Sequence, residues 1–318
     1  MNKRNYSINL VSGGSGFIGS HLIDKLMERG EKVICLDNFS TGKIENLAKW
    51  KNNKRLIFIS QDVMHKIKER IKVDRIWHLA CPASPLKYQK DPINTSKIIF
   101  NGTLNMLDIA KRENAKILFA SSSEIYGNPI VHPQEEEYFG NVALNSKRSC
   151  YEEGKRIAET LCNDFKRKYN LKIKIPRIFN TYGPRMLPND GRVISNFIYQ
   201  SLNNKQLTVY GNGNQTRSFC YIEDLIEGLL KFMESSYTGT INLGNPEEIT
   251  IKDLAKLIIS KTNPNLGIKY SDQNLDEPLQ RKPIIEKAKK EINWSPKISL
   301  SEGLDKTIKN FKDIIGNE

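Results

Sequence analysis

The stretch INLVSGGSGFIGS, residues 8–20, decides the fold of this chain. Its first four residues are an apolar run of the kind that forms a buried strand, and a helical pattern of apolar residues follows. Glycines in this loop permit a tight turn, a close approach of the backbone to a pyrophosphate, and close packing of helix on strand. The order of strand, loop and helix predicts a dinucleotide site whose cofactor contacts are Gly13, Gly16, Phe17, Ile18 and Gly19.

The end of the next predicted strand, residues 32–36, indicates which dinucleotide binds. Asp37 follows this strand at the distance from the glycine loop where an acid binds the adenosine ribose hydroxyls. A carboxylate there repels a 2′-phosphate, so the sequence predicts NAD and not NADP. The alternative is that Asp37 and Asn38 only form a turn. Later strand ends add Asp62 and Val63, which we expect near the adenine, and Leu79.

Strands and helices alternate through the first half of the chain. Further strands are predicted at residues 55–59, 75–80, 116–120 and 171–175, and long helices at 92–112 and 149–169. Such repeats predict an α/β fold with a doubly wound parallel sheet of the Rossmann type. We place a NAD-binding Rossmann domain at residues 1–180. A smaller C-terminal substrate lobe follows at 181–318, with segments near 237–245 returning to the main sheet.

The composition excludes several other classes of protein. The 318 residues contain no apolar run long enough to cross a membrane, and Met1–Arg4 lead straight into the first strand, so we expect no signal peptide. Five scattered cysteines without a C-x-x-C motif indicate reduced thiols in the cytoplasm, and no zinc or other metal site. The net charge is +13, but the basic residues are spread out, which favours a small anionic substrate over nucleic acid.

Tyr151 and Lys155 are the candidate catalytic pair. A spacing of four places both side chains on one face of the helix at 149–169. A free tyrosine has a pKa of about 10, and a neighbouring ammonium group favours the phenolate, so we expect Lys155 to lower the pKa of Tyr151. Tyr-x-x-x-Lys alone is a weak signal. Together with the glycine loop and with Ser122 at another strand end, it predicts a proton acceptor for a substrate hydroxyl.

These motifs together resemble the extended short-chain dehydrogenase/reductases that act on nucleotide sugars. Further strings are similar to the UDP-glucuronate decarboxylase (UDP-xylose synthase) branch, and the resemblance covers nearly the whole chain. The strings are CPASP (81–85), SEIYG (123–127), RIFNTYGPR (177–185), NDGRV (189–193), LTVYG (207–211), QTR (215–217) and RKP (281–283). The chain departs from the pattern at Cys81, Ile99 and Ser122, where relatives commonly have Ser, Asn and Thr.

The resemblance implies a NAD-dependent decarboxylation of UDP-glucuronate through a transient 4-ketone. Tyr151 would take the C4 hydroxyl proton, Lys155 would hold the nicotinamide ribose, and Ser122 would bind the C4 oxygen. Glu124 would orient the sugar, or a water that protonates C5, and Arg281 would position the carboxylate or polarise a water. The remaining substrate contacts implied are Ser123, Asn180, Arg185, Arg192, Tyr210, Gln215 and Arg217, with the arginines on the UDP phosphates.

Other activities share this framework. UDP-apiose/xylose synthase, a 4-epimerase and a 4,6-dehydratase are the alternatives among enzymes, and a non-catalytic NAD-binding scaffold is the alternative outside them. A dehydratase needs an acid where this chain has Ser123, which argues against that activity. The intact set of Ser122, Tyr151 and Lys155 argues against a pure scaffold. Relatives pair the helices equivalent to 92–112 and 149–169, so the resemblance also implies a homodimer.

Overall fold

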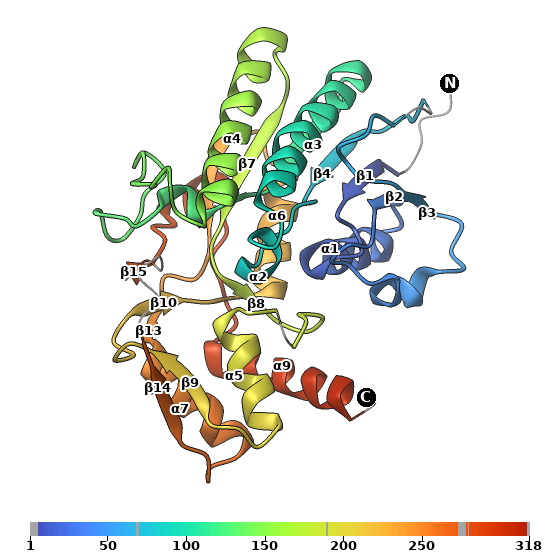
Figure 1. The fold of residues 1–318 in the computed structure, drawn as a ribbon. Coiled ribbons are helices and arrows are strands. Elements are labelled where there is room, and N and C mark those ends of the chain that lie inside the picture. Colours follow the sequence, from blue (N-terminus) through green and yellow to red (C-terminus); the bar gives the residue numbers. More distant parts are fainter. Residues whose placement is uncertain (1–5, 68–69, 189, 273–277, 279, 317–318) are drawn as a thin grey trace.

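A computed structural model describes residues 6–67, 70–188, 190–272, 278 and 280–316 of the chain. Residues 1–4, expected to precede the first strand directly, and Asn189 of the NDGRV string lie outside the described residues. A parallel sheet occupies the centre of the molecule (Figure 1). Its eight described strands are, in spatial order, β12 (Gly239–Leu243), β7 (Ile173–Ile178) with β6 (Ser121–Ser122) beside it, β5 (Lys116–Phe119), β4 (Arg75–His78), β1 (Ile8–Ser12), β2 (Lys32–Asp37) and β3 (Leu56–Ser60).

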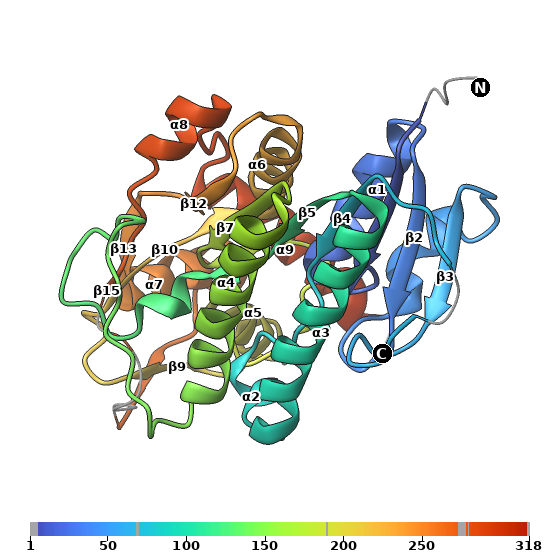
Figure 2. The same cartoon turned by 90° about the horizontal axis from the view of Figure 1, so that it is seen from above.

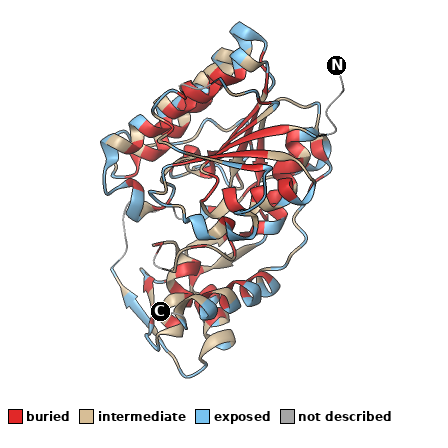
Figure 3. Ribbon diagram, turned by 90° about the vertical axis from the view of Figure 1, so that its right-hand side faces the viewer, coloured by how far each residue is buried: buried red, intermediate tan, exposed pale blue. Residues whose placement is uncertain are grey.

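Helices cover both faces of this sheet, because its strands are apolar on both sides. Leu10 and Ile34 belong to the core under α3 (Pro92–Glu113) and α4 (Ser149–Tyr169). Their neighbours along the strands belong to the opposite core, under α1 (Phe17–Glu28) and α6 (Ile222–Glu234). Figure 2 shows α3 and α4 side by side, and Figure 3 shows the buried strands between the layers. The predicted doubly wound parallel sheet is confirmed.

Residues with known capping preferences mark the ends of α3 and α4, the two long helices predicted to form the dimer interface. The Asp91 side chain accepts a hydrogen bond from the Asn94 amide, and Pro92 opens α3. Asn114 and Asn170, which follow α3 and α4, both adopt the left-handed conformation that ends helices. These helices are the ones predicted at 92–112 and 149–169.

The second half of the chain builds a smaller lobe and also completes the main sheet. Within this second half, the chain returns to the main sheet, where β12 pairs with β7 in parallel register. The second half of the chain also forms strands of three small sheets, which are β13–β10–β15, β14–β9 and β11–β8. The remaining elements are η1 (Ile44–Trp50), α2 (Pro85–Tyr88), η2 (Ser123–Tyr126), β8 (Thr181–Tyr182), α5 (Val193–Leu202), β9 (Leu207–Tyr210), β10 (Thr216–Ser218), β11 (Cys220–Tyr221), β13 (Glu248–Thr250), α7 (Ile251–Thr262), β14 (Ile268–Ser271), β15 (Gln280–Arg281), α8 (Glu286–Ile292) and α9 (Leu300–Ile315).

The described helices fall short of the requirements for a membrane span. Among the described residues, none of the helices combines the length and the apolar character that a bilayer span requires.

Candidate active site

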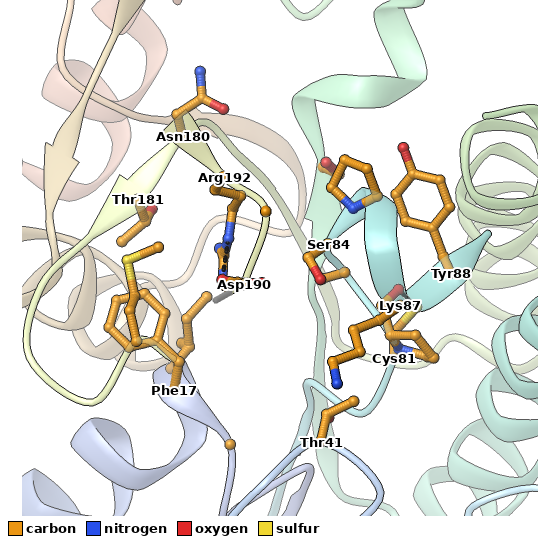
Figure 4. Close-up of a pocket in the computed structure, with 18 of the residues that line it drawn as sticks. Phe17, Thr41, Cys81, Ser84, Lys87, Tyr88, Asn180, Thr181, Asp190 and Arg192 are labelled. Carbon is orange, nitrogen blue, oxygen red and sulfur yellow. Dashed lines mark hydrogen bonds and ion pairs between the residues drawn. The ribbon is translucent and has the colours of Figure 1, made fainter. Parts of the chain in front are cut away.

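A cavity of about 410 Å³ lies between the ends of the main-sheet strands and the second lobe. Every site residue predicted from the sequence lines it, from the glycine loop to Arg217 and Arg281. In Figure 4, Phe17, Thr181 and Arg192 form one wall, and Ser84 and Tyr88 form the facing wall. The fold therefore brings together residues that lie far apart in the chain, although their individual roles stay predictions.

The glycine loop is shaped so that larger residues would not fit. Gly13 has a φ of +74°, and a Cβ there would lie 2.8 Å from the Ala80 amide nitrogen. A Cβ on Gly19 would collide with the Gly13 carbonyl oxygen. The backbone of the loop is thus exposed to the cavity without side chains, directly before the first turn of α1. This geometry fits the pyrophosphate of a dinucleotide.

Asp37 stands at the end of β2 and holds the glycine loop. Its carboxylate accepts hydrogen bonds from the amides of Ser15 at 2.9 Å and Phe39 at 2.8 Å. Asp62 accepts a hydrogen bond from the Asn38 side chain at 2.7 Å on the same side of the cavity. A carboxylate has about four acceptor positions, so Asp37 keeps capacity for ribose hydroxyls. The residues present therefore fit NAD, and their charge disfavours an additional phosphate.

Replacing Asp37 tests the cofactor preference. We expect the unmodified protein to bind NAD more tightly than NADP. Asp37→Ala should reduce the ratio of the two affinities by about tenfold or more, because it removes a repulsion of a few kcal/mol between the carboxylate and the 2′-phosphate of NADP. Calorimetric titration with both nucleotides measures this ratio. Asp37→Asn is the matched control, because it removes the charge but keeps an acceptor for the loop amides. A preference of the unmodified protein for NADP would contradict our interpretation of β2.

Tyr151 is buried on the first turns of α4 and hydrogen-bonds Ser122 at the end of β6. Burial raises the pKa of the Tyr151 phenol well above its ordinary value, Cys81 raises it further, and the bond to Ser122 lowers it. Lys155 donates to the Ala120 carbonyl oxygen at 2.7 Å, with its Nζ 5.7 Å from the centre of the Tyr151 ring. The expectation that Lys155 leaves Tyr151 with a lowered pKa is wrong, because burial of the phenol outweighs the groups that lower its pKa.

A buried cluster of charges surrounds Glu124 on η2. Glu124 pairs with Arg148 through one oxygen, and its other oxygen lies 3.2 Å from Nη1 of Arg281. Arg281, only 1% exposed, also donates to the Ser123 hydroxyl at 3.3 Å and to a backbone carbonyl. Burial opposes ionisation of Glu124, but Arg148 and Arg281 outweigh it and lower its pKa to about 2. Glu124 is therefore a carboxylate at neutral pH, suited to accepting hydrogen bonds and unsuited to donating a proton.

The predicted phosphate-binding arginines already have partners within the chain. Arg185 lies 2.6 Å from Asp24 on α1, so it also ties the second lobe to the first. Arg192 donates to Asp190 at 2.6 Å and lies over the Phe17 ring (Figure 4). The remaining predicted contacts, Asn180, Tyr210, Gln215 and Arg217, line the same part of the cavity. Contacts of these side chains with UDP stay predictions.

Tyr88 and Arg148 also line the cavity, although the sequence did not predict them as site residues. Tyr88 is buried and stacks on Tyr151, with ring centres 5.0 Å apart, and its hydroxyl has no hydrogen-bond partner among the residues that the structure describes. Arg148 lies directly before α4 and pairs with Glu124. A signal for Arg148 exists in the sequence, because a cation at a helix N-terminus is unfavourable unless a carboxylate compensates it. No comparable local signal marks Tyr88.

Comparisons with known proteins agree with this geometry. The NAD dependent epimerase/dehydratase family matches residues 9–244. UDP-glucuronic acid decarboxylase 3 of Arabidopsis thaliana is 52% identical over 95% of this chain and 88% of its own length, and decarboxylase 1 of that plant is 50% identical over 97% and 71%. UDP-glucuronic acid 4-epimerase of Bacillus cereus, solved with UDP-glucuronic acid and NAD, superposes with a TM-score of 0.87 at 28% identity over 96% of this chain and 99% of its own. The chain therefore belongs to the NAD dependent epimerase/dehydratase family and, within it, to the UDP-glucuronic acid decarboxylases.

Proposed function

We propose that this protein converts UDP-glucuronate to UDP-xylose and carbon dioxide, with NAD recycled in the site. The observation that carries the proposal is the joining of two residue sets in one cavity. Ser122, Tyr151 and Lys155 can serve oxidation at C4, and the pair of Glu124 and Arg281 can serve the carboxylate end of the sugar. The identity of about 50% to decarboxylases over nearly the whole chain supports the same activity.

The first step is oxidation of the C4 hydroxyl of the sugar. Tyr151 takes the hydroxyl proton, and Lys155 holds the nicotinamide ribose. The Ser122 oxygen already accepts a hydrogen bond from the Glu124 amide at 3.2 Å, so its own hydrogen can be donated to the C4 oxygen. When bound, NAD would be held by the glycine loop, Asp37 and Lys155, and it would supply a reversible acceptor for the C4 hydride and a positive charge that favours the Tyr151 phenolate.

The next steps remove the carboxyl group. The ketone at C4 lies β to the carboxylate on C5, so the bond between C5 and the carboxylate breaks and its electron pair passes to the C4 oxygen. The hydroxyls of Tyr151 and Ser122 stabilise that oxyanion, an effect of about 3–4 kcal/mol per donor in other enzymes. C5 takes a proton from water oriented by Glu124, and Tyr151 returns its proton to the C4 oxygen during reduction. One proton is consumed, and no net oxidation occurs.

Incubation with UDP-glucuronate and NAD, followed by NMR of the sugar product, tests this function. We expect carbon dioxide and UDP-xylose, without lasting NADH absorbance. UDP-apiose in the product would identify an apiose/xylose synthase, and UDP-galacturonate would identify a 4-epimerase like the Bacillus cereus neighbour. Turnover of UDP-glucose with UDP-glucuronate inert would exclude the decarboxylase. Bound NAD without turnover of any UDP-sugar would support a scaffold.

We also propose that the protein is a homodimer paired through α3 and α4. These helices lie side by side on one face (Figures 1 and 2). They expose apolar side chains, with Ile93 69%, Phe100 38% and Ile157 42% accessible. Light scattering should give twice the chain mass, and Phe100→Asp with Ile157→Asp should give a monomer. A monomeric unmodified protein would contradict the proposal.

The five free cysteines support a cytoplasmic location, because reduced thiols persist in that compartment. Fractionation of the source cells tests this, and recovery of the protein from an oxidising compartment would contradict it.

A further inference from the structure

We propose that Arg148 is a positioning residue that fixes Glu124 for protonation of C5 after carbon dioxide has left. This inference rests on the proposed decarboxylation and deepens it, because it assigns a role in one step of the reaction to a residue outside the predicted site.

Arg148 connects α4, which carries the proposed base Tyr151, to η2, which carries Glu124. Its backbone carbonyl accepts hydrogen bonds from the amides of Tyr151 at 2.9 Å and Glu152 at 3.1 Å, so it anchors the first turn of α4. Its guanidinium Nη2 donates to Glu124 on η2. The backbone of Arg148 therefore supports the turn that carries Tyr151, and its side chain holds Glu124.

Glu124 is held from two sides. One oxygen pairs with Arg148, the residue directly before α4, and the other pairs with Arg281 from β15 in the second lobe. Rotation of the carboxylate would break at least one of these pairs. The Glu124 side chain is still 20% exposed, which leaves an edge open toward the cavity that it lines. A fixed, ionised carboxylate with one free edge can orient a water at a single face of the sugar ring.

A purely structural role for Arg148 does not account for both of its ion pairs. Its Nε already donates to Glu152 at 3.0 Å, one turn along the same helix. That pair alone would compensate a buried arginine, yet Nη2 reaches across to a cavity residue. A guanidinium also offers its donors in a rigid fork, which fixes the geometry of both partners in a way that an ammonium group does not.

The charges around Glu124 predict the effect of removing Arg148. Burial and the carboxylate of Glu152 disfavour the ionised form of Glu124, and the guanidinium groups oppose them. Without Arg148, two guanidinium groups face two carboxylates, so the pKa of Glu124 rises and the side chain loses one of its restraints. The titratable and charged groups facing Glu124 are Arg148 directly before α4, Tyr151 and Glu152 from α4, Tyr88 from α2, Arg281 from β15 and Arg217 from β10.

The experiment follows C5 protonation in D₂O. The unmodified enzyme should place deuterium at one of the two C5 positions of UDP-xylose. Arg148→Gln should slow turnover by about 10²-fold, the cost of a catalytic group displaced by about an ångström. It should also scramble the deuterium, while C4 oxidation in a single turnover stays near its normal rate. Arg148→Lys should restore part of both properties.

Arg156→Gln is the matched control. Arg156 lies on the same helix and holds the neighbouring loop through the carbonyls of Ile125 and Phe139, without contacting Glu124. The Arg156→Gln variant should still place deuterium at only one of the two C5 positions. Single-site deuterium and normal turnover in folded Arg148→Gln, or in Arg148→Lys if the glutamine variant does not fold, would overturn the proposal.

A second measurement does not depend on the reaction. NMR of carboxyl-labelled glutamate, assigned with Glu124→Gln, follows the ionisation of Glu124 without substrate. Glu124 should stay ionised over the whole range in which the unmodified protein is folded, and should titrate at higher pH in the Arg148 variants. An unchanged titration would overturn the role of Arg148 even if the protein decarboxylates UDP-glucuronate. A shifted titration in a protein inert toward that substrate would instead reject the proposed function alone.

Discussion

Tyr151→Phe is expected to lower the turnover number by about 10²–10⁴-fold, the usual contribution of a positioned acid–base group. The change removes only the hydroxyl that hydrogen-bonds Ser122. The ring can still stack on Tyr88, so the fold and NAD binding should be retained. Turnover measured by product formation, together with the NAD content of the purified protein, tests both expectations.

The pH dependence of the same variant adds a second test. Burial raises the pKa of Tyr151, so its deprotonated fraction at neutral pH is small and grows as the pH increases. If the deprotonated form is active, kcat/KM of the unmodified enzyme rises toward alkaline pH, and Tyr151→Phe loses that rise. Tyr138→Phe is a suitable control, because its hydroxyl accepts a bond from the Ile130 amide outside the cavity. Near-normal turnover of Tyr151→Phe would rule out Tyr151 as the base.

The sequence predicts the parts of this site that depend on local order. The glycine loop, Asp37 and the pair of Tyr151 and Lys155 follow from a strand end or a helical spacing, because backbone geometry alone places such residues. Arg281 is different. It meets η2 from a short strand more than 150 residues away, so no local pattern predicts its position, and only the resemblance indicated it.

Burial and long-range pairing explain what the sequence could not predict. The pKa of Tyr151 depends on how completely the fold removes water from its hydroxyl, which a spacing of four residues does not reveal. Arg185 was assigned to phosphate on its charge, yet its partner Asp24 lies on α1, 161 residues away in the chain. Tyr88 is placed by a short helix between two strands of the Rossmann unit, and its type alone does not distinguish a core residue from a cavity residue.

Glu124→Gln separates decarboxylation from cofactor binding. The amide keeps the shape of the side chain but not its charge, so Arg148 and Arg281 lose their common carboxylate. Formation of UDP-xylose should fall by about 10²–10⁴-fold, because C5 is no longer protonated from an oriented water. The affinities for NAD and UDP should change much less, since neither the glycine loop nor Asp37 contacts Glu124. Product formation at several substrate concentrations and calorimetry with NAD and UDP measure the two effects.

A matched variant distinguishes chemistry from stability. Glu159→Gln also removes a buried carboxylate from an arginine pair, with Arg177 at 2.9 Å, but Glu159 does not line the cavity. Both variants should lower the melting temperature at neutral pH, and only Glu124→Gln should abolish most product formation. The low pKa of Glu124 means that its stabilising contribution is complete above about pH 4.5 and is lost as the pH falls toward about 2. The difference in melting temperature between the unmodified protein and Glu124→Gln should therefore shrink on acidification. Full UDP-xylose formation by Glu124→Gln would exclude the carboxylate from the reaction, and C5 would then have to be protonated without it.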